Sequence, residues 1–112
     1  MTSLWHGGNF GWLVRRAKAG IERIARHYCP IATAFRWRGS RLRQPSFCVE
    51  VATDQQRDRL VQVPNLYQQF RDALGDAGYP TNVVPSIHFR VESRETLDRK
   101  YGGNCSEAME MP

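Results

Sequence analysis

Three side chains that could take part in acid–base or metal chemistry lie on two predicted strands. His88, with Glu50 and Glu92, would offer an imidazole and two carboxylates on the outward faces of neighbouring strands. An imidazole beside carboxylates can move a proton or ligate a metal ion. The other two histidines, His6 and His27, lie far away in the sequence. A small metal-dependent enzyme centred on His88 is therefore a hypothesis, but it ranks third, behind two binding functions. Under the leading hypothesis the protein has no catalytic residue, metal ligand or cofactor.

A second group of residues could bind phosphates. Four arginines stand among two aromatic residues within nine positions: Phe35, Arg36, Trp37, Arg38, Arg41 and Arg43. Arginine on a β-hairpin can neutralise phosphates, and aromatic rings can stack on unpaired bases. Together with Arg15, Arg23 and Arg26 on a predicted helix, this pattern favours a nucleic-acid-binding module as the second hypothesis. The alternative is that Phe35 and Trp37 belong to the core and that the arginines are their solvent-facing neighbours.

The third group lies near the end of the chain, in a stretch of mixed charges that runs from residue 89 to residue 104. The residues that could contact a partner are Glu92, Arg94, Glu95, Asp98, Arg99, Tyr101 and Asn104. Charges of both signs around an aromatic ring suit a specific and fast-forming protein interface. The alternative is a solvated helix face with internal ion pairs, each contributing less than about 1 kcal/mol.

This stretch resembles the closing segment of small bacterial immunity proteins, which neutralise polymorphic or contact-dependent toxins. The resemblance implies a cytoplasmic, non-enzymatic protein that binds one cognate toxin domain and blocks its active site. Inhibitors of nucleases are often acidic, whereas this chain carries a net charge of +5. A toxin that is not a nuclease, or contact through the acidic second half, would fit this charge. Toxin neutralisation is the leading hypothesis.

Charge is distributed unevenly along the 112 residues. Residues 1–53 carry nine basic and two acidic residues (+7), and residues 54–112 carry seven and nine (−2). The length fits a single domain, 1–112, in which we expect 1–9 and 105–112 to be mobile ends. No apolar run is long enough to cross a membrane and no secretory signal is recognisable, so we expect a cytoplasmic protein. Three widely spaced cysteines without a C-x-x-C motif predict reduced thiols.

The elements that must position these groups follow from the periodicity of apolar residues. A stripe that includes Leu13, Ala17 and Ile21 predicts a helix from Phe10 to Tyr28 with a basic outer face, and Pro30 ends it. Alternation predicts strands over 31–38 and 47–52, paired as a hairpin, and a third over 85–92. Thr53 and Gln56 form a capping box for a helix that ends near Val63. Pro64 starts another helix that stops at Gly75 or Gly78, and Ser93 caps a last helix ending near Tyr101.

The predicted order is therefore α-β-β-α-α-β-α, an α+β fold with a small antiparallel or mixed sheet of about three strands and helices packed on one face. Over residues 10–92 this order is similar to that of the second type of KH domain, which binds single-stranded RNA. That family holds the nucleic-acid backbone with a Gly-x-x-Gly loop between two helices. Here the corresponding segment, residues 61–66, contains no glycine, so the resemblance is limited to topology.

Overall fold

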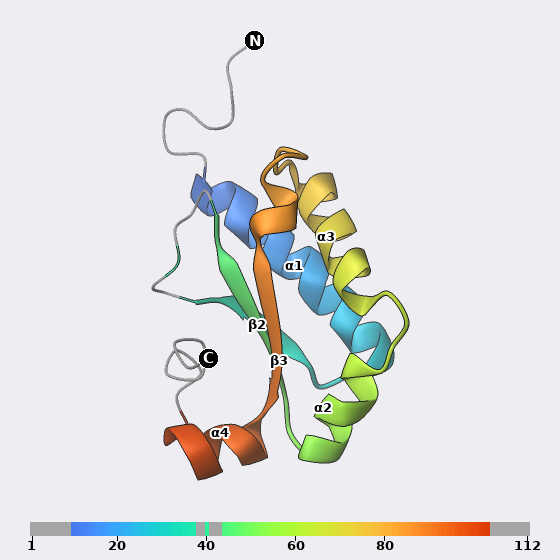
Figure 1. Ribbon diagram of the computed structural model, residues 1–112, viewed down its shortest axis with the longest axis vertical. Helices are drawn as coiled ribbons and strands as arrows, with labels where there is room; N and C mark the ends of the chain where they lie inside the picture. The colour runs from blue at the N-terminus through green and yellow to red at the C-terminus, as the bar shows by residue number, and fades with distance from the viewer. Residues whose placement is uncertain (1–9, 38–39, 41–43, 104–112) are drawn as a thin grey trace.

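The computed structural model describes residues 10–37, 40 and 44–103, and it confirms the predicted α+β order (Figure 1). The elements are α1 (Phe10–Tyr28), β1 (Thr33–Arg36), β2 (Ser46–Val51), α2 (Asp54–Val61), α3 (Leu66–Ala77), the short 3-10 helix η1 (Val84–Ser86), β3 (His88–Ser93) and α4 (Arg94–Tyr101). None of the described helices is long and apolar enough to span a membrane.

The sheet is mixed, with the strands in the order β1-β2-β3. β1 and β2 form the expected antiparallel pair. β3 lies parallel to β2, because α2 and α3 return the chain to the end of the sheet at which β2 begins. Phe47 and Val49 face α1 and α3 within the main core, as their alternation predicts. We expected all helices on this face, but Leu97 of α4 packs on Cys48 from the opposite face.

Residue size suggests that the larger side chains of β1 face the core, but the structure buries the opposite face of the strand. Ala32 and Ala34 are buried, whereas Ile31 is 53% exposed and Thr33 is exposed as well. α1 lies directly over this strand, and the small methyl groups of the alanines allow the helix to approach closely. Phe35, on the other face, is half-buried beside Cys48 and Leu97. The strand is also shorter than predicted, and Arg38 lies outside the described residues.

Two side chains of α1 cover the free edge of β1. Glu22 accepts a hydrogen bond of 2.9 Å from the backbone N–H of Ala34, and Arg26 donates one of 2.8 Å to the carbonyl of Ala32. Glu22 and Arg26 also form an ion pair at 3.2 Å. Such contacts satisfy backbone groups that would otherwise pair with another chain.

The predicted helix caps are confirmed in detail. Thr53 and Gln56 form the capping box of α2, and the Ser93 hydroxyl accepts from the backbone N–H of Thr96 at the start of α4. α3 ends at Gly78, whose φ of 120° suits glycine, and it begins after Asn65, one residue beyond Pro64. β3 starts at His88, since residues 84–86 form η1 around Pro85.

Two cysteines are described. Cys29 is a buried free thiol, in agreement with the prediction, but Cys48 is disulfide-bonded, so the expectation of reduced cysteines is wrong at this position.

Candidate functional site

β3 passes into α4 beside the first turn of α2 (Figure 1). Charged side chains of these three elements form ion pairs there. Ser93 is the last residue of β3 and the N-cap of α4, and Asp54 is the first residue of α2. The N-terminal ends of α2 and α4 therefore lie together, with Thr53 as the N-cap of α2 and Ser93 as the N-cap of α4. The backbone N–H of Glu95 donates to the carbonyl of Ala52, and that of Asp54 donates to the Glu95 carboxylate at 2.7 Å.

Asp54 is the centre of the first set of contacts. Its carboxylate accepts hydrogen bonds from the hydroxyls of Ser93 and Thr96, the latter at 2.7 Å, and from Arg99 at 3.2 Å. The Ser93 and Thr96 hydroxyls, together with Arg99, outweigh partial desolvation and hold the pKa of Asp54 well below its usual range. Asp54 therefore stays ionised and fixes Arg99 on the surface of α4.

Glu92 is the centre of the second set. It was expected on the outward face of β3, and it does lie on that face opposite Glu50, but it is only 5% exposed. Its carboxylate accepts from Arg57 at 2.9 Å, from Arg90 at 3.2 Å and from the backbone N–H of Ser93. Burial alone would raise the pKa of Glu92, but these hydrogen bonds outweigh it and lower the pKa.

Arg57 joins the two sets. Besides Glu92 it bonds the Thr96 hydroxyl at 2.8 Å and Asp58 at 3.1 Å, and it lies 3.5 Å from Asp54. The hydrogen bond to Glu92 is the main reason that the pKa of Arg57 is raised. No local pattern places Arg57 in this site, because its partners Glu92 and Thr96 lie 35 and 39 positions away.

The outer side of this network is a surface that we call the α4 surface: Arg94, Glu95, Asp98 and Arg99, all of which are exposed. Arg94 pairs with Glu50 beneath it and donates to the carbonyl of Gly103 at 2.9 Å. Tyr101 is half-buried, with its hydroxyl 3.4 Å from Arg90. The structure thus brings six of the seven predicted partner-contacting residues to one end of the sheet, although Glu92 lies beneath the surface. Asn104 lies outside the described residues.

Of the residues predicted to bind nucleic acid, the structure describes Arg15, Arg23, Arg26 and Arg36. Arg36 donates to the carbonyl of Ser40 at 2.7 Å and of Trp37 at 3.2 Å, and so it folds back on its own loop. Arg38, Arg41 and Arg43 lie outside the described residues. On α1, Arg15, Arg23 and Arg26 are exposed as predicted.

The grouping of His88 with two glutamates is wrong. Glu50 pairs with Glu92 across the sheet, but His88 pairs with Ser46 and lies four residues further along β3, about 13 Å from Glu92. Within the described part of the chain, no group of three or more His, Cys, Asp or Glu side chains could hold a metal ion.

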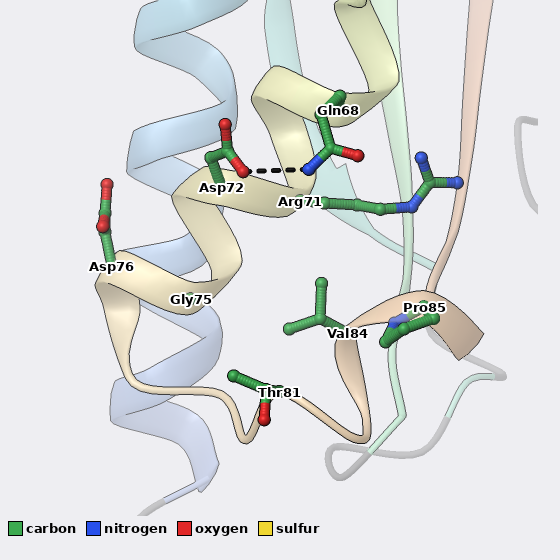
Figure 2. Close-up of a pocket in the computed structure, with 8 residues that line it drawn as sticks. All are labelled: Gln68, Arg71, Asp72, Gly75, Asp76, Thr81, Val84 and Pro85. Carbon is green, nitrogen blue, oxygen red and sulfur yellow. Dashed lines mark hydrogen bonds between the residues drawn. The ribbon is translucent and has the colours of Figure 1, made fainter.

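A shallow pocket of about 830 Å³ lies between α3 and the segment that leads to β3 (Figure 2). Val84 and Pro85 form one wall, and Gly75 leaves space in the other. The carboxylates of Asp72 and Asp76 point away from Val84, and Asp72 bonds Gln68 at 3.0 Å. The labelled acidic groups therefore do not converge on a substrate position.

The chain was compared with family models, curated proteins and solved structures, and none of them matches it. Chemically, the α4 surface offers both hydrogen-bond donors and acceptors in fixed positions above a buried carboxylate. Such an arrangement can recognise a complementary surface.

Proposed function

We propose that the protein is a non-enzymatic binding protein that neutralises a cognate bacterial toxin in the cytoplasm. In this proposal the α4 surface docks on the toxin domain and blocks its active site. The resemblance of residues 89–104 to immunity proteins names the partner, and the network around Glu92 and Asp54 supports the choice of surface.

One observation carries the proposal: the buried carboxylate of Glu92 pairs with Arg57 and Arg90 beneath the exposed charges of the α4 surface. A buried ion pair contributes little net stability, because both charges lose their hydration when they are buried. Apolar residues of similar volume often stabilise a fold equally or more. The distinctive effect of Glu92, Arg57 and Asp54 is to fix the positions of α4 and of Arg99. Side chains that are ordered before binding lose less conformational entropy when a partner docks.

The charges of the α4 surface favour a protein partner over a polyanion. Arg94 and Arg99 stand on either side of Glu95 and Asp98 in the sequence, so that the surface presents both signs of charge within a single helix. Phosphates would be repelled by the two carboxylates, whereas a protein surface can complement the whole pattern.

Growth protection tests this proposal. The chain is expressed together with the toxin domain encoded by the neighbouring gene, and complex formation is measured with the purified pair. Asp98→Arg reverses a charge that is 62% exposed and whose ion pair with Arg94 contributes little to stability. We expect Asp98→Arg to weaken the complex at least tenfold, about 1.4 kcal/mol, and to lower protection.

The matched control is Asp76→Arg, which makes the same change of charge on the exposed side of α3. It should bind and protect like the unaltered chain. The proposal fails if the unaltered chain does not protect, if its gene has no toxin-encoding neighbour, or if both variants behave alike.

A further inference from the structure

A second charged surface lies on α1 and is not used by the proposed function. We call it the basic face of α1: Arg15, Arg16, Lys18, Arg23 and Arg26, all exposed. The only acidic residue within α1 is Glu22, and it turns toward Ala34 and Arg26 at the edge of β1. We propose that the basic face binds the phosphate backbone of double-stranded nucleic acid without sequence preference.

Charge is balanced differently on α1 and in the region of α2 and α4. Around α2 and α4, the acidic residues Glu50, Asp54, Asp58, Glu92 and Asp98 all form ion pairs with arginines. On α1, by contrast, Arg15, Arg16, Lys18 and Arg23 form no ion pair with any described acidic residue. The neighbouring helix α3 exposes Asp72 and Asp76, but neither pairs with α1 among the described residues. Among the described residues, α1 therefore carries four exposed positive groups without an acidic partner.

The residue types of the basic face favour phosphate binding. Four of the five positive groups are arginines, and the planar guanidinium forms paired hydrogen bonds with phosphate oxygens. Arg16 lies over the exposed ring of Trp12, with its guanidinium carbon 4.7 Å from the ring centre, so that a cation–π contact limits its motion. α1 contains neither Asn nor Gln, side chains that commonly read adenine. The basic face therefore offers several guanidinium groups to phosphate oxygens.

The shape of α1 suits a duplex. Arg15 and Arg23 are separated by about 12 Å along the helix, which allows contact with more than one phosphate. A helix surface is convex and cannot enclose a single strand, but a helix about 10–12 Å wide fits the major groove of a duplex, about 12 Å wide. Insertion into a membrane is disfavoured because the apolar side of α1, with Leu13, Ala17 and Ile21, is buried in the core.

The two surfaces are independent, because α1 packs on the face of the sheet that carries Phe47 and Val49, whereas α4 packs on the face that carries Cys48. Failure of the toxin-neutralising proposal would leave the basic face unaffected, and the reverse also holds.

Fluorescence anisotropy of a labelled DNA duplex of arbitrary sequence, over a range of salt concentrations, tests the inference. The logarithm of the binding constant should fall linearly with the logarithm of salt, by about 0.9 for each phosphate neutralised. The double variant Arg15→Gln, Arg23→Gln should weaken binding and reduce this slope by about two. The matched control Arg59→Gln, Lys100→Gln removes the same charge from α2 and α4 and should leave the slope unchanged.

Several outcomes would overturn the inference. They are no binding by the unaltered chain at low salt, equal losses in the two double variants, and tighter binding to a single strand than to the duplex. Binding to vesicles of anionic lipid but not to the duplex would also overturn it. Circular dichroism of each variant shows whether the helices are retained, so that a loss of binding is not confused with unfolding.

Discussion

At the scale of single residues, Glu92 shows how a carboxylate can lie in a core without losing its charge. Its two oxygens are held by Arg57 and Arg90, and the backbone N–H of Ser93 adds a third donor. These donors replace the water that burial removes, and removing one partner leaves a buried polar group unsatisfied. Glu92 therefore ties β3 to α2 by a contact that depends on pH.

The first prediction concerns acid stability. Because the pKa of Glu92 is lowered in the folded state from its ordinary value of 4.5, its stabilising effect is complete above about pH 4.5 and is lost as the pH falls through the folded pKa. Glu92→Gln should lower the free energy of unfolding at neutral pH by about 1–3 kcal/mol. It should also make the decrease of stability in acid shallower.

Urea unfolding at a series of pH values measures this effect. The control is Asp76→Asn, which alters an exposed carboxylate and should change neither the stability at pH 7 nor its dependence on pH. A Glu92→Gln variant whose stability follows pH as steeply as the unaltered chain would contradict the prediction.

At the scale of elements, the contact between α1 and α3 depends on a glycine. Gly20 lowers the intrinsic helix propensity of α1 by about 1 kcal/mol relative to alanine. The structure explains its presence, because a Cβ atom at this position would lie 3.1 Å from the Cβ of Ala73. The missing side chain lets the two helices approach closely enough to bury Ile21 and Phe70, which are both fully enclosed.

The second prediction follows from this contact. Gly20→Val should destabilise the protein by about 1–3 kcal/mol, since overpacking forces the helices apart. Ala73→Gly in the same chain should recover part of the loss. Gly75→Ala is the control, because nothing lies within 4 Å of the added Cβ, and it should stabilise α3 by up to about 1 kcal/mol. Thermal or urea unfolding of five chains measures these effects: the unaltered chain, Gly20→Val, Ala73→Gly, the double variant and Gly75→Ala. Additive effects of the changes at Gly20 and Ala73 would refute the contact.

At the scale of the whole molecule, a single core joins α1, α2, α3 and the three strands. α4 contributes Leu97 to a second, smaller cluster with Cys48, on the other face of the sheet. The network around Asp54 and Glu92 connects α4 to α2 and β3, so both faces of the sheet are coupled through the same charged contacts.

The third prediction is that the protein unfolds in one cooperative step. Transitions in urea followed by far-ultraviolet circular dichroism and by tryptophan fluorescence should coincide, with a slope of about 1–3 kcal/mol per molar urea. Two separate transitions would show that the α4 cluster unfolds independently of the main core.

Local patterns determined much of this fold before any tertiary contact was known. The apolar stripe of α1, the capping box at Thr53 and the cap at Ser93 act within one helical turn or one helix face, so the sequence alone predicts them. The alternation of Phe47, Val49 and Val51 likewise marks the buried face of β2, since all three are large and apolar. The seven elements and their order followed from such signals.

Tertiary structure decided the features that depend on distant partners. Alternation in β1 offered two faces, and the position of α1 selected the alanines for burial instead of the larger Ile31 and Phe35. The parallel register of β3 separated His88 from Glu50 and paired Glu50 with Glu92. Arg57 covered Glu92 from another helix, so a carboxylate in an apparently exposed position became buried. Hydrophobicity and capping act over a few residues, whereas burial and charge pairing depend on which surfaces the folded chain brings together.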